Sequence, residues 1–125
     1  MSLKFTVVTA VFNAEDVIEK TIKSVLNQTY TPYEYLIIDG KSSDKTVEII
    51  RKYSKHFEEK NITLKIVSEK DNGIYNAMNK GIDLAEGDFI SFLNAGDWYE
   101  LDALENINKF YEEDSFDLTY GGITL

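Results

Sequence analysis

The chain has 125 residues, and its 22 acidic against 13 basic residues give a formal net charge of −9 at pH 7. This length corresponds to a single domain, residues 1–125. The absence of cysteine excludes disulfides, zinc–thiolate sites and thiol nucleophiles, and the acidic balance argues against a nucleic-acid partner, because no basic surface is available to neutralise phosphates.

The first half of the chain alternates between strand-like and helix-like hydrophobic spacing. A continuous apolar run predicts a strand at residues 5–10, and the apolar residues from Ile18 to Leu26 then recur at helical spacing, with Asn13 expected as the N-cap. A second apolar run predicts a strand at residues 35–39. The polar residues 42–44 precede one further helix, whose apolar face holds residues 47, 50, 53 and 57.

The second half repeats the same alternation. A strand is predicted at residues 64–68, a helix at about 74–85, a strand at 89–93, a helix around residues 104–111 and a final strand at 116–120. The strands at 5–10, 35–39 and 89–93 are nearly continuous apolar runs, which is typical of parallel strands that are buried on both faces.

This order of elements predicts an α/β fold with an open, mostly parallel sheet and helices on both faces. In such a sheet a ligand binds outside the carboxyl ends of the strands, near the point where the strand order reverses. No stretch approaches the 18–20 apolar residues of a membrane span, so no transmembrane segment is expected. The N-terminal apolar run is short, so no signal peptide is expected either, and the expected location is cytoplasmic.

The turns after the predicted strands carry polar residues and glycines, but no G-x-G-x-x-G or P-loop pattern occurs. Asp39, Asp71 and Asp97 follow successive strands, and such carboxylates attract Mg²⁺ or Mn²⁺, which would in turn draw a diphosphate into the cleft. The same residue types also form ordinary turns and helix caps. From the residues alone, a metal-assisted phosphate site and a purely structural set of turns both remain open.

Four segments in register closely resemble the family 2 nucleotide-sugar glycosyltransferases, which have the three-layer, Rossmann-like GT-A fold. They are TVVTAVFNAEDVIEKTIKSVLNQTY, YLIIDGKSSDKTVEII, SEKDNGIYNAMNKGIDLAEGDFISFLNAGDWY and the helix that follows, so the resemblance covers residues 5–120. It implies transfer of a sugar from a nucleotide-diphosphate donor to the hydroxyl group of a saccharide or lipid-linked acceptor, with inversion, in polysaccharide biosynthesis. The intact protein would then act in the cytoplasm or at the inner face of the membrane.

The resemblance also implies which residues bind the donor. Phe12 stands where an aromatic residue often contacts the base, and Asp39 stands where an aspartate holds the base or ribose. Asp97 matches the last acid of the family's D-x-D-type element, which holds a divalent ion, Mg²⁺ or Mn²⁺, against the diphosphate. The positions that match the family's nucleotide-binding residues are Val11, Phe12, Asn13, Asp39, Lys41, Asp71 and Asn79.

The chain departs from the family pattern at several places. Asp39-Gly40 stands where many members have two consecutive aspartates, Asn94 to Asp97 leaves one carboxylate in place of a full D-x-D, and Met78 stands where arginine is frequent. Family members continue into an acceptor-binding half that supplies the general base. We therefore expect this chain to be the donor-binding portion, with no catalytic base assigned.

Two other classes remain as alternatives. A non-catalytic nucleotide-binding module would fit the single carboxylate and the missing base. A phosphoacceptor receiver domain has a similar size and alternation, but it needs an acidic pair after the first strand and an aspartate at the end of the third. Those places hold residues 11–13, Val-Phe-Asn, and residues 68–69, Ser-Glu.

Overall fold

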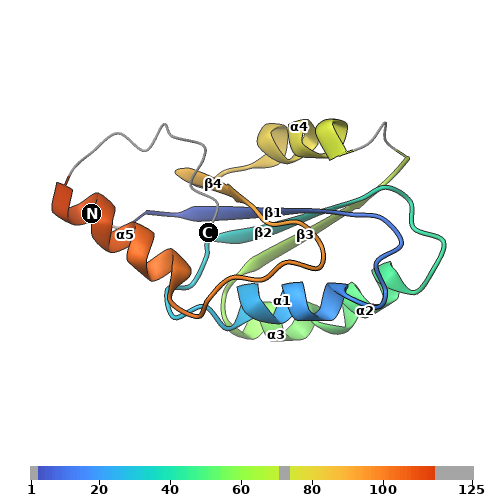
Figure 1. Ribbon diagram of the computed structural model, residues 1–125, viewed down its shortest axis with the longest axis horizontal. Coiled ribbons are helices and arrows are strands. Elements are labelled where there is room, and N and C mark those ends of the chain that lie inside the picture. Colours follow the sequence, from blue (N-terminus) through green and yellow to red (C-terminus); the bar gives the residue numbers. More distant parts are fainter. Residues whose placement is uncertain (1–2, 71–73, 115–125) are drawn as a thin grey trace.

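A parallel sheet forms the centre of the molecule (Figure 1). The computed structural model describes residues 3–70 and 74–114. Within them the sheet has the strand order β3-β2-β1-β4, and every neighbouring pair is parallel. The strands are β1 (Phe5–Val11), β2 (Glu34–Asp39), β3 (Thr63–Ser68) and β4 (Phe89–Phe92). The four strands predicted in this part of the chain are confirmed, with ends shifted by one residue; the strand predicted at 116–120 lies outside the described residues.

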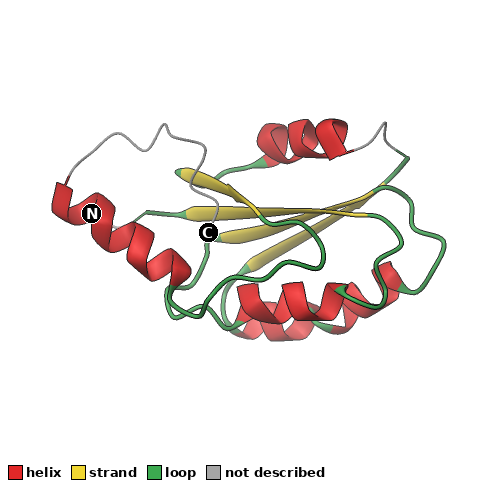
Figure 2. Ribbon diagram, in the orientation of Figure 1, coloured by secondary structure: helices red, strands yellow, loops and turns green. Residues whose placement is uncertain are grey.

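Helices cover both faces of this sheet, which confirms the three-layer α/β prediction (Figure 2). The helices α1, α2 and α3 lie on one side of the sheet and α4 lies on the other (Figure 1). In the part of the chain that the structure describes, no helix combines the length and the apolar character needed to cross a bilayer. The helices are α1 (Ile18–Leu26), α2 (Thr46–Lys52), α3 (Ser54–Glu59), α4 (Ile74–Leu84) and α5 (Ala103–Asp114).

Two local predictions about the helices are wrong. Asn13 does not cap α1: the helix begins at Ile18 after a turn in which the amides of Val17 and Ile18 both donate to Ala14 O, and Asn13 takes a left-handed φ of 46°. The single helix expected after residues 42–44 is divided at Tyr53, whose amide donates to Ile50 O three residues back. The apolar face stays buried on both sides of this division. Helical spacing did not predict the break, because the same side of the chain faces inward before and after it.

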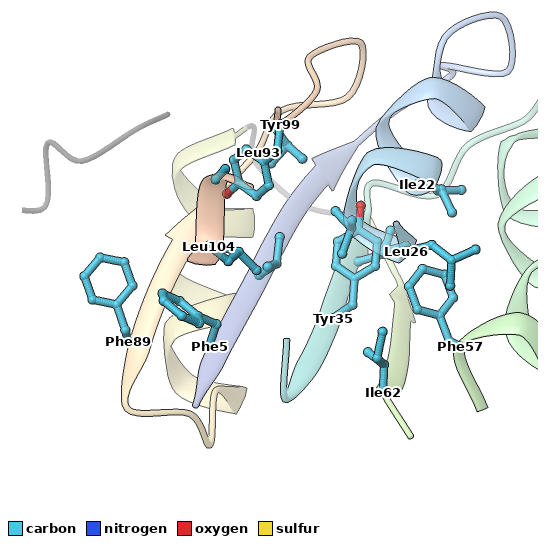
Figure 3. Close-up of a cluster of buried hydrophobic side chains, with 14 of the residues drawn as sticks. Phe5, Ile22, Leu26, Tyr35, Phe57, Ile62, Phe89, Leu93, Tyr99 and Leu104 are labelled. Carbon is cyan, nitrogen blue, oxygen red and sulfur yellow. The ribbon is translucent and has the colours of Figure 1, made fainter. Parts of the chain in front are cut away.

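The main core lies between the sheet and the helices α1, α3 and α5 (Figure 3). Phe5 on β1 makes edge-to-face contacts with Phe89 on β4 and with Tyr30, at centroid distances of 5.4 and 5.5 Å. Tyr35 on β2 is fully buried beside Phe57 of α3, and its hydroxyl is hydrogen-bonded to Thr9 Oγ1 at 2.7 Å. These contacts anchor the two central strands, and therefore the ends of those strands, in the core.

The opposite face is thinner and depends on close contact between α4 and β1. Val8, Leu36 and Ile38 face this side and pack with Ala77 of α4. Gly81 allows the approach, because a Cβ atom there would lie 2.6 Å from Val8 Cγ1. A larger residue at position 81 would force the helix away from the sheet.

A buried carboxylate stabilises the amino-terminal edge of the sheet. Glu34 Oε2 accepts hydrogen bonds from Thr6 Oγ1 at 2.7 Å and from the Glu86 amide at 2.5 Å. Among the described residues, the only partner of Oε1 is the ammonium group of Lys65 at 3.3 Å. Burial opposes ionisation, but these hydrogen bonds and the lysine outweigh it and lower the pKa of Glu34 below its ordinary value of 4.5.

Replacement of Glu34 by glutamine is expected to lower the free energy of unfolding by about 1–2 kcal/mol at neutral pH, because charge-assisted bonds and the ion pair are lost. Since the folded pKa is lowered, this contribution is complete above pH 4.5 and disappears as the pH falls through the folded value. Urea denaturation between about pH 7 and about pH 3 should show the stabilities of the wild type and Glu34→Gln converging in acid.

Glu86→Gln is the matched control, because this exposed carboxylate lies 3.8 Å from the same lysine. It should leave the stability within about 0.5 kcal/mol at every pH. A constant difference between wild type and Glu34→Gln down to about pH 3 would contradict a lowered pKa.

Candidate functional site

The candidate site lies where the strand order reverses. β1 pairs with β2 on one side and with β4 on the other, so the chain leaving β1 runs between the loops that follow these neighbours. Parallel strands end at the same edge, so the loops after β1, β2 and β4 gather there. The loops comprise residues 12–17, 40–45 and 93–102.

Hydrogen bonds between side chains and backbone join the loop after β1 to the loop after β2. The Asn13 amide donates to Ser42 Oγ and the Ser43 amide donates to Asn13 Oδ1, both at 2.8 Å. The Ala14 amide donates to Thr46 Oγ1 at 2.8 Å. The strained conformation of Asn13 is therefore supported by reciprocal contacts, and the two loops form one body.

Asp44 connects the same two loops at the start of α2. Its carboxylate accepts hydrogen bonds from the Thr46 amide at 3.0 Å, from Thr46 Oγ1 at 2.5 Å and from the Glu15 amide at 3.2 Å. Desolvation opposes the charged form, but the hydrogen bonds from these donors together outweigh it and lower the pKa of Asp44. A second hydrogen bond runs in the opposite direction between the loops, from the Lys45 amide to the carboxylate of Glu15.

Asp39 is fully buried at the end of β2 and binds the ends of the neighbouring segments. Its carboxylate accepts hydrogen bonds from the Ser42 amide at 3.0 Å, from Ser42 Oγ at 2.5 Å and from Ser68 Oγ at 2.7 Å. Ser68 is the last residue of β3, so one carboxylate connects the ends of two strands with the loop that faces Asn13. Most of its accepting capacity is thus used within the protein.

Asp97 has a different environment. It lies in the turn after β4, where its amide donates to Asn94 O at 3.0 Å and the preceding Gly96 has a φ of 98°. Its side chain is exposed, and no described residue forms a hydrogen bond or an ion pair with its carboxylate. Asp97 therefore offers a free anionic ligand at the edge where the strand order reverses.

A pocket of about 630 Å³ opens beside Asp97. Lys20 Nζ lies 3.4 Å from the centroid of the half-exposed Trp98 ring, so α1 orients one wall of the pocket. The walls come from β4, the following loop and α5 and include Phe92, Asn94, Asp97, Trp98, Asp102 and Asn106.

Apart from Asp39 and Asp97, the residues that the resemblance selects lie in different parts of the molecule. The two loops that are linked by hydrogen bonds, residues 12–17 and 40–45, are called the joined loops below, and they contain Phe12, Asn13 and Lys41. The Phe12 side chain is 62% exposed, whereas the Val11 side chain belongs to the core. Asn79 is exposed on α4, on the other face of the sheet from α1. Asp71 lies outside the described residues.

The sequence interpretation missed Thr46, Ser68 and Thr21, which hold the site loops in place. The sequence contained one signal for Thr21. It is a polar residue on the apolar side of α1, beside Ile22, and a polar residue there needs a hydrogen-bond partner. Its partners come from residues 75 or more positions away, so spacing could not identify them.

The free carboxylate of Asp97 fits a divalent cation of the Mg²⁺ or Mn²⁺ class. These ions often use one or two protein carboxylates and take their remaining ligands from waters and substrate phosphates. Among the described residues no group of three or more His, Cys, Asp or Glu side chains is placed to enclose a metal. The arrangement suits an ion that is bound jointly with a phosphate ligand.

Comparison with known proteins identifies the family. The family model described as "Glycosyl transferase family 2" matches residues 6–125. A PGL/p-HBAD biosynthesis glycosyltransferase of Mycobacterium tuberculosis is 33% identical over 123 residues, which cover 97% of this chain and 47% of the relative. The putative teichuronic acid biosynthesis glycosyltransferase TuaG of Bacillus subtilis is 33% identical over 120 residues, which cover 96% of this chain and 46% of TuaG.

A solved structure extends the likeness to the fold. Residues 1–349 of Staphylococcus aureus TarS, determined in complex with UDP-GlcNAc, superpose with a TM-score of 0.78 at 25% identity, covering 90% of this chain and 32% of that one. The chain thus spans about half the length of the curated relatives it matches. The family match argues against the receiver-domain alternative.

Replacement of Asp39 by asparagine is expected to destabilise the protein by about 1–3 kcal/mol, because the amide group of asparagine would face the hydroxyl and amide donors of Ser42 and Ser68. Urea denaturation at neutral pH measures this loss. Asp16→Asn is the control, since Asp16 is an exposed aspartate in the turn before α1. Equal stability of both variants would contradict the structural role of Asp39.

Proposed function

The chain belongs to glycosyl transferase family 2, and we propose that it forms the donor-binding part of an inverting enzyme that transfers a sugar from a nucleotide-diphosphate donor. The observation that carries this proposal is the exposed carboxylate of Asp97, which has no partner among the described residues. It lies at the edge where the strand order reverses, and the preceding Gly96 lies against Val17 of the loop that also carries Phe12. TarS, determined with UDP-GlcNAc, supports a nucleotide sugar as the donor class.

The joined loops are the proposed nucleoside site. Phe12 is exposed. The side chain and the backbone of its neighbour Asn13 are both hydrogen-bonded to the loop after β2. The ring is therefore presented to solvent on a restrained backbone, which suits stacking on a base. We propose polar contacts to the nucleoside from Asn13, Lys41 and Asp71, and from Asn79 on α4. The buried Asp39, which we expected to bind the nucleoside directly, is proposed to act by holding the loop that carries Ser42.

Asp97 is the proposed ligand of Mg²⁺ or Mn²⁺ at the donor diphosphate. When bound, such an ion stabilises the negative charge that develops on the leaving phosphate oxygens. The protein contributes a carboxylate that no described residue neutralises, on a turn whose backbone is bonded to α1. The neighbouring Asn94 offers a neutral amide oxygen as a further ligand.

The acceptor and the general base are proposed for the whole enzyme and not for the described residues. Inversion requires a hydroxyl group and a base within hydrogen-bond reach of each other. We assign no base among the described residues, and we propose that acceptor binding uses the part of the relatives that this chain does not span. The proposed acceptor is a saccharide or a lipid-linked acceptor, used in the cytoplasm or at the inner face of the membrane.

A non-catalytic nucleotide-binding module is the second candidate. It is favoured by the turn at residues 94–97, where Asp97 supplies a single carboxylate. Donor binding without sugar transfer or donor hydrolysis, measured on the full-length protein with UDP-GlcNAc and other nucleotide sugars, would support the module over the enzyme.

The central test measures thermal stability with UDP, GDP, dTDP and CDP, each with Mn²⁺ and with EDTA. A ligand that binds only the folded chain stabilises it by about 2.7 kcal/mol at one hundred times its dissociation constant. We expect a Mn²⁺-dependent shift with one nucleotide that is lost in Asp97→Asn. Asp83→Asn, an exposed aspartate of α4 that does not line this pocket, should keep the shift. Absence of a shift with every nucleotide would contradict a preformed donor site.

Replacement of Phe12 by alanine is expected to weaken binding of the selected nucleotide by about tenfold, since stacking of a base on an aromatic side chain contributes about 1–3 kcal/mol. The unfolding transition should stay unchanged because the ring is 62% exposed. Isothermal titration calorimetry measures the affinity. Leu101→Ala, an apolar side chain that is 61% exposed, is the control and should bind as the wild type does.

A further inference from the structure

Polar side chains on one side of α1 bind the segment that carries Asp97. Thr21 and Gln28 are both buried and lie seven residues apart, which is about two helical turns, so they share one side of the helix and its C-terminal extension. Both form hydrogen bonds to backbone groups between Gly96 and Leu104. The following Thr29 amide adds a bond to Leu101 O at 2.9 Å.

Thr21 makes the contact closest to the proposed cation ligand. Its Oγ1 accepts a hydrogen bond from the Gly96 amide at 2.8 Å and donates one to Asp97 O at 2.7 Å. One hydroxyl group is therefore hydrogen-bonded to the backbone on both sides of the Gly96–Asp97 peptide bond. Gly96 has a φ of 98°, a left-handed conformation that favours glycine. The Thr21 hydroxyl group holds the turn in this conformation from α1.

Gln28 anchors the far end of the same segment. Its Nε2 donates to Glu100 O at 2.6 Å and to Ser24 O at 3.0 Å, and its Oε1 accepts from the Leu104 amide at 3.0 Å. The loop between β4 and α5 is thus attached to α1 at both ends. The Asp97 carboxylate has no described partner, so its orientation depends on the backbone that Thr21 holds.

We propose that Thr21 is a positioning residue for a divalent cation at Asp97, with Gln28 anchoring the other end of the loop. This inference rests on the proposed donor site. A single carboxylate binds an ion jointly with phosphate oxygens only when it points toward them, and outer groups that orient a metal ligand typically affect metal affinity by about 10- to 100-fold. The buried hydroxyl of Thr21 supplies that orientation without touching the ion.

The experiment compares Thr21→Ser with Thr21→Ala, a pair that differs only in the hydroxyl group. Thr21→Val adds a variant of nearly the same shape as the wild type. Ser24→Ala is the matched control, because the Ser24 hydroxyl lies on α1 but donates only to Thr21 O, within the helix. Circular dichroism and urea denaturation establish which variants fold.

The first measurement is hydrogen exchange and needs no ligand. Thr21→Ala and Thr21→Val should accelerate exchange at the Gly96 amide, which loses its acceptor, whereas Thr21→Ser and Ser24→Ala should protect it as the wild type does. If Thr21→Val does not fold, the serine and alanine variants decide. Equal protection of Gly96 in both of these variants would overturn the proposal.

The second measurement is nucleotide affinity with Mn²⁺ and with EDTA, using whichever of UDP, GDP, dTDP and CDP the wild type binds. Thr21→Ala should lose about tenfold in affinity relative to Thr21→Ser when Mn²⁺ is present and should equal it in EDTA. The same loss in EDTA, or no loss with Mn²⁺, would overturn the positioning role. Failure of the wild type to bind any of the four nucleotides would instead refute the proposed function on which the inference rests.

Discussion

Parallel pairing of β1 with β2 on one side and β4 on the other is the constraint on which the site depends. It places the ends of all three strands at one edge, and the loops that follow them lead to α1, α2 and α5. The core makes this pairing stable, since Phe5, Tyr35 and Phe89 join the central strands to the helices and to one another. The loops after these strands therefore start from fixed points.

Beyond those points, the loops are held by polar side chains that bind backbone groups. Asn13 and Ser42 connect the loops after β1 and β2, Asp39 binds the end of β3 through Ser68, and Thr21 holds the turn after β4. Each of these bonds satisfies a backbone amide or a hydroxyl group that would otherwise need water. Much of the polar character of the site thus serves its shape, whereas the carboxylate of Asp97 binds no other group in the part of the chain that the structure describes.

The sequence allowed prediction of the sheet but not of its local corrections. Continuous apolar runs identified β1, β2 and β4 because both of their faces are covered, and alternation with helical spacing indicated the parallel order. The break at Tyr53 and the turn before Ile18 escaped prediction, because neither changes which face is apolar. At the site, the family resemblance selected Phe12 and Asp97, whereas the burial of Asp39 and the contacts of Thr21 depend on residues distant in the chain.

The attachment of α1 to the segment after β4 has an evolutionary consequence. Gln28 binds Glu100 and Leu104 only through their backbone groups, and a backbone partner imposes no side-chain identity on the residue that supplies it. Mutations at the positions around the pocket, such as Glu100 and Asp102, can therefore accumulate without releasing the loop. A fold built in this way can acquire new substrate preferences by changing the pocket wall while the frame that carries Asp97 stays in place.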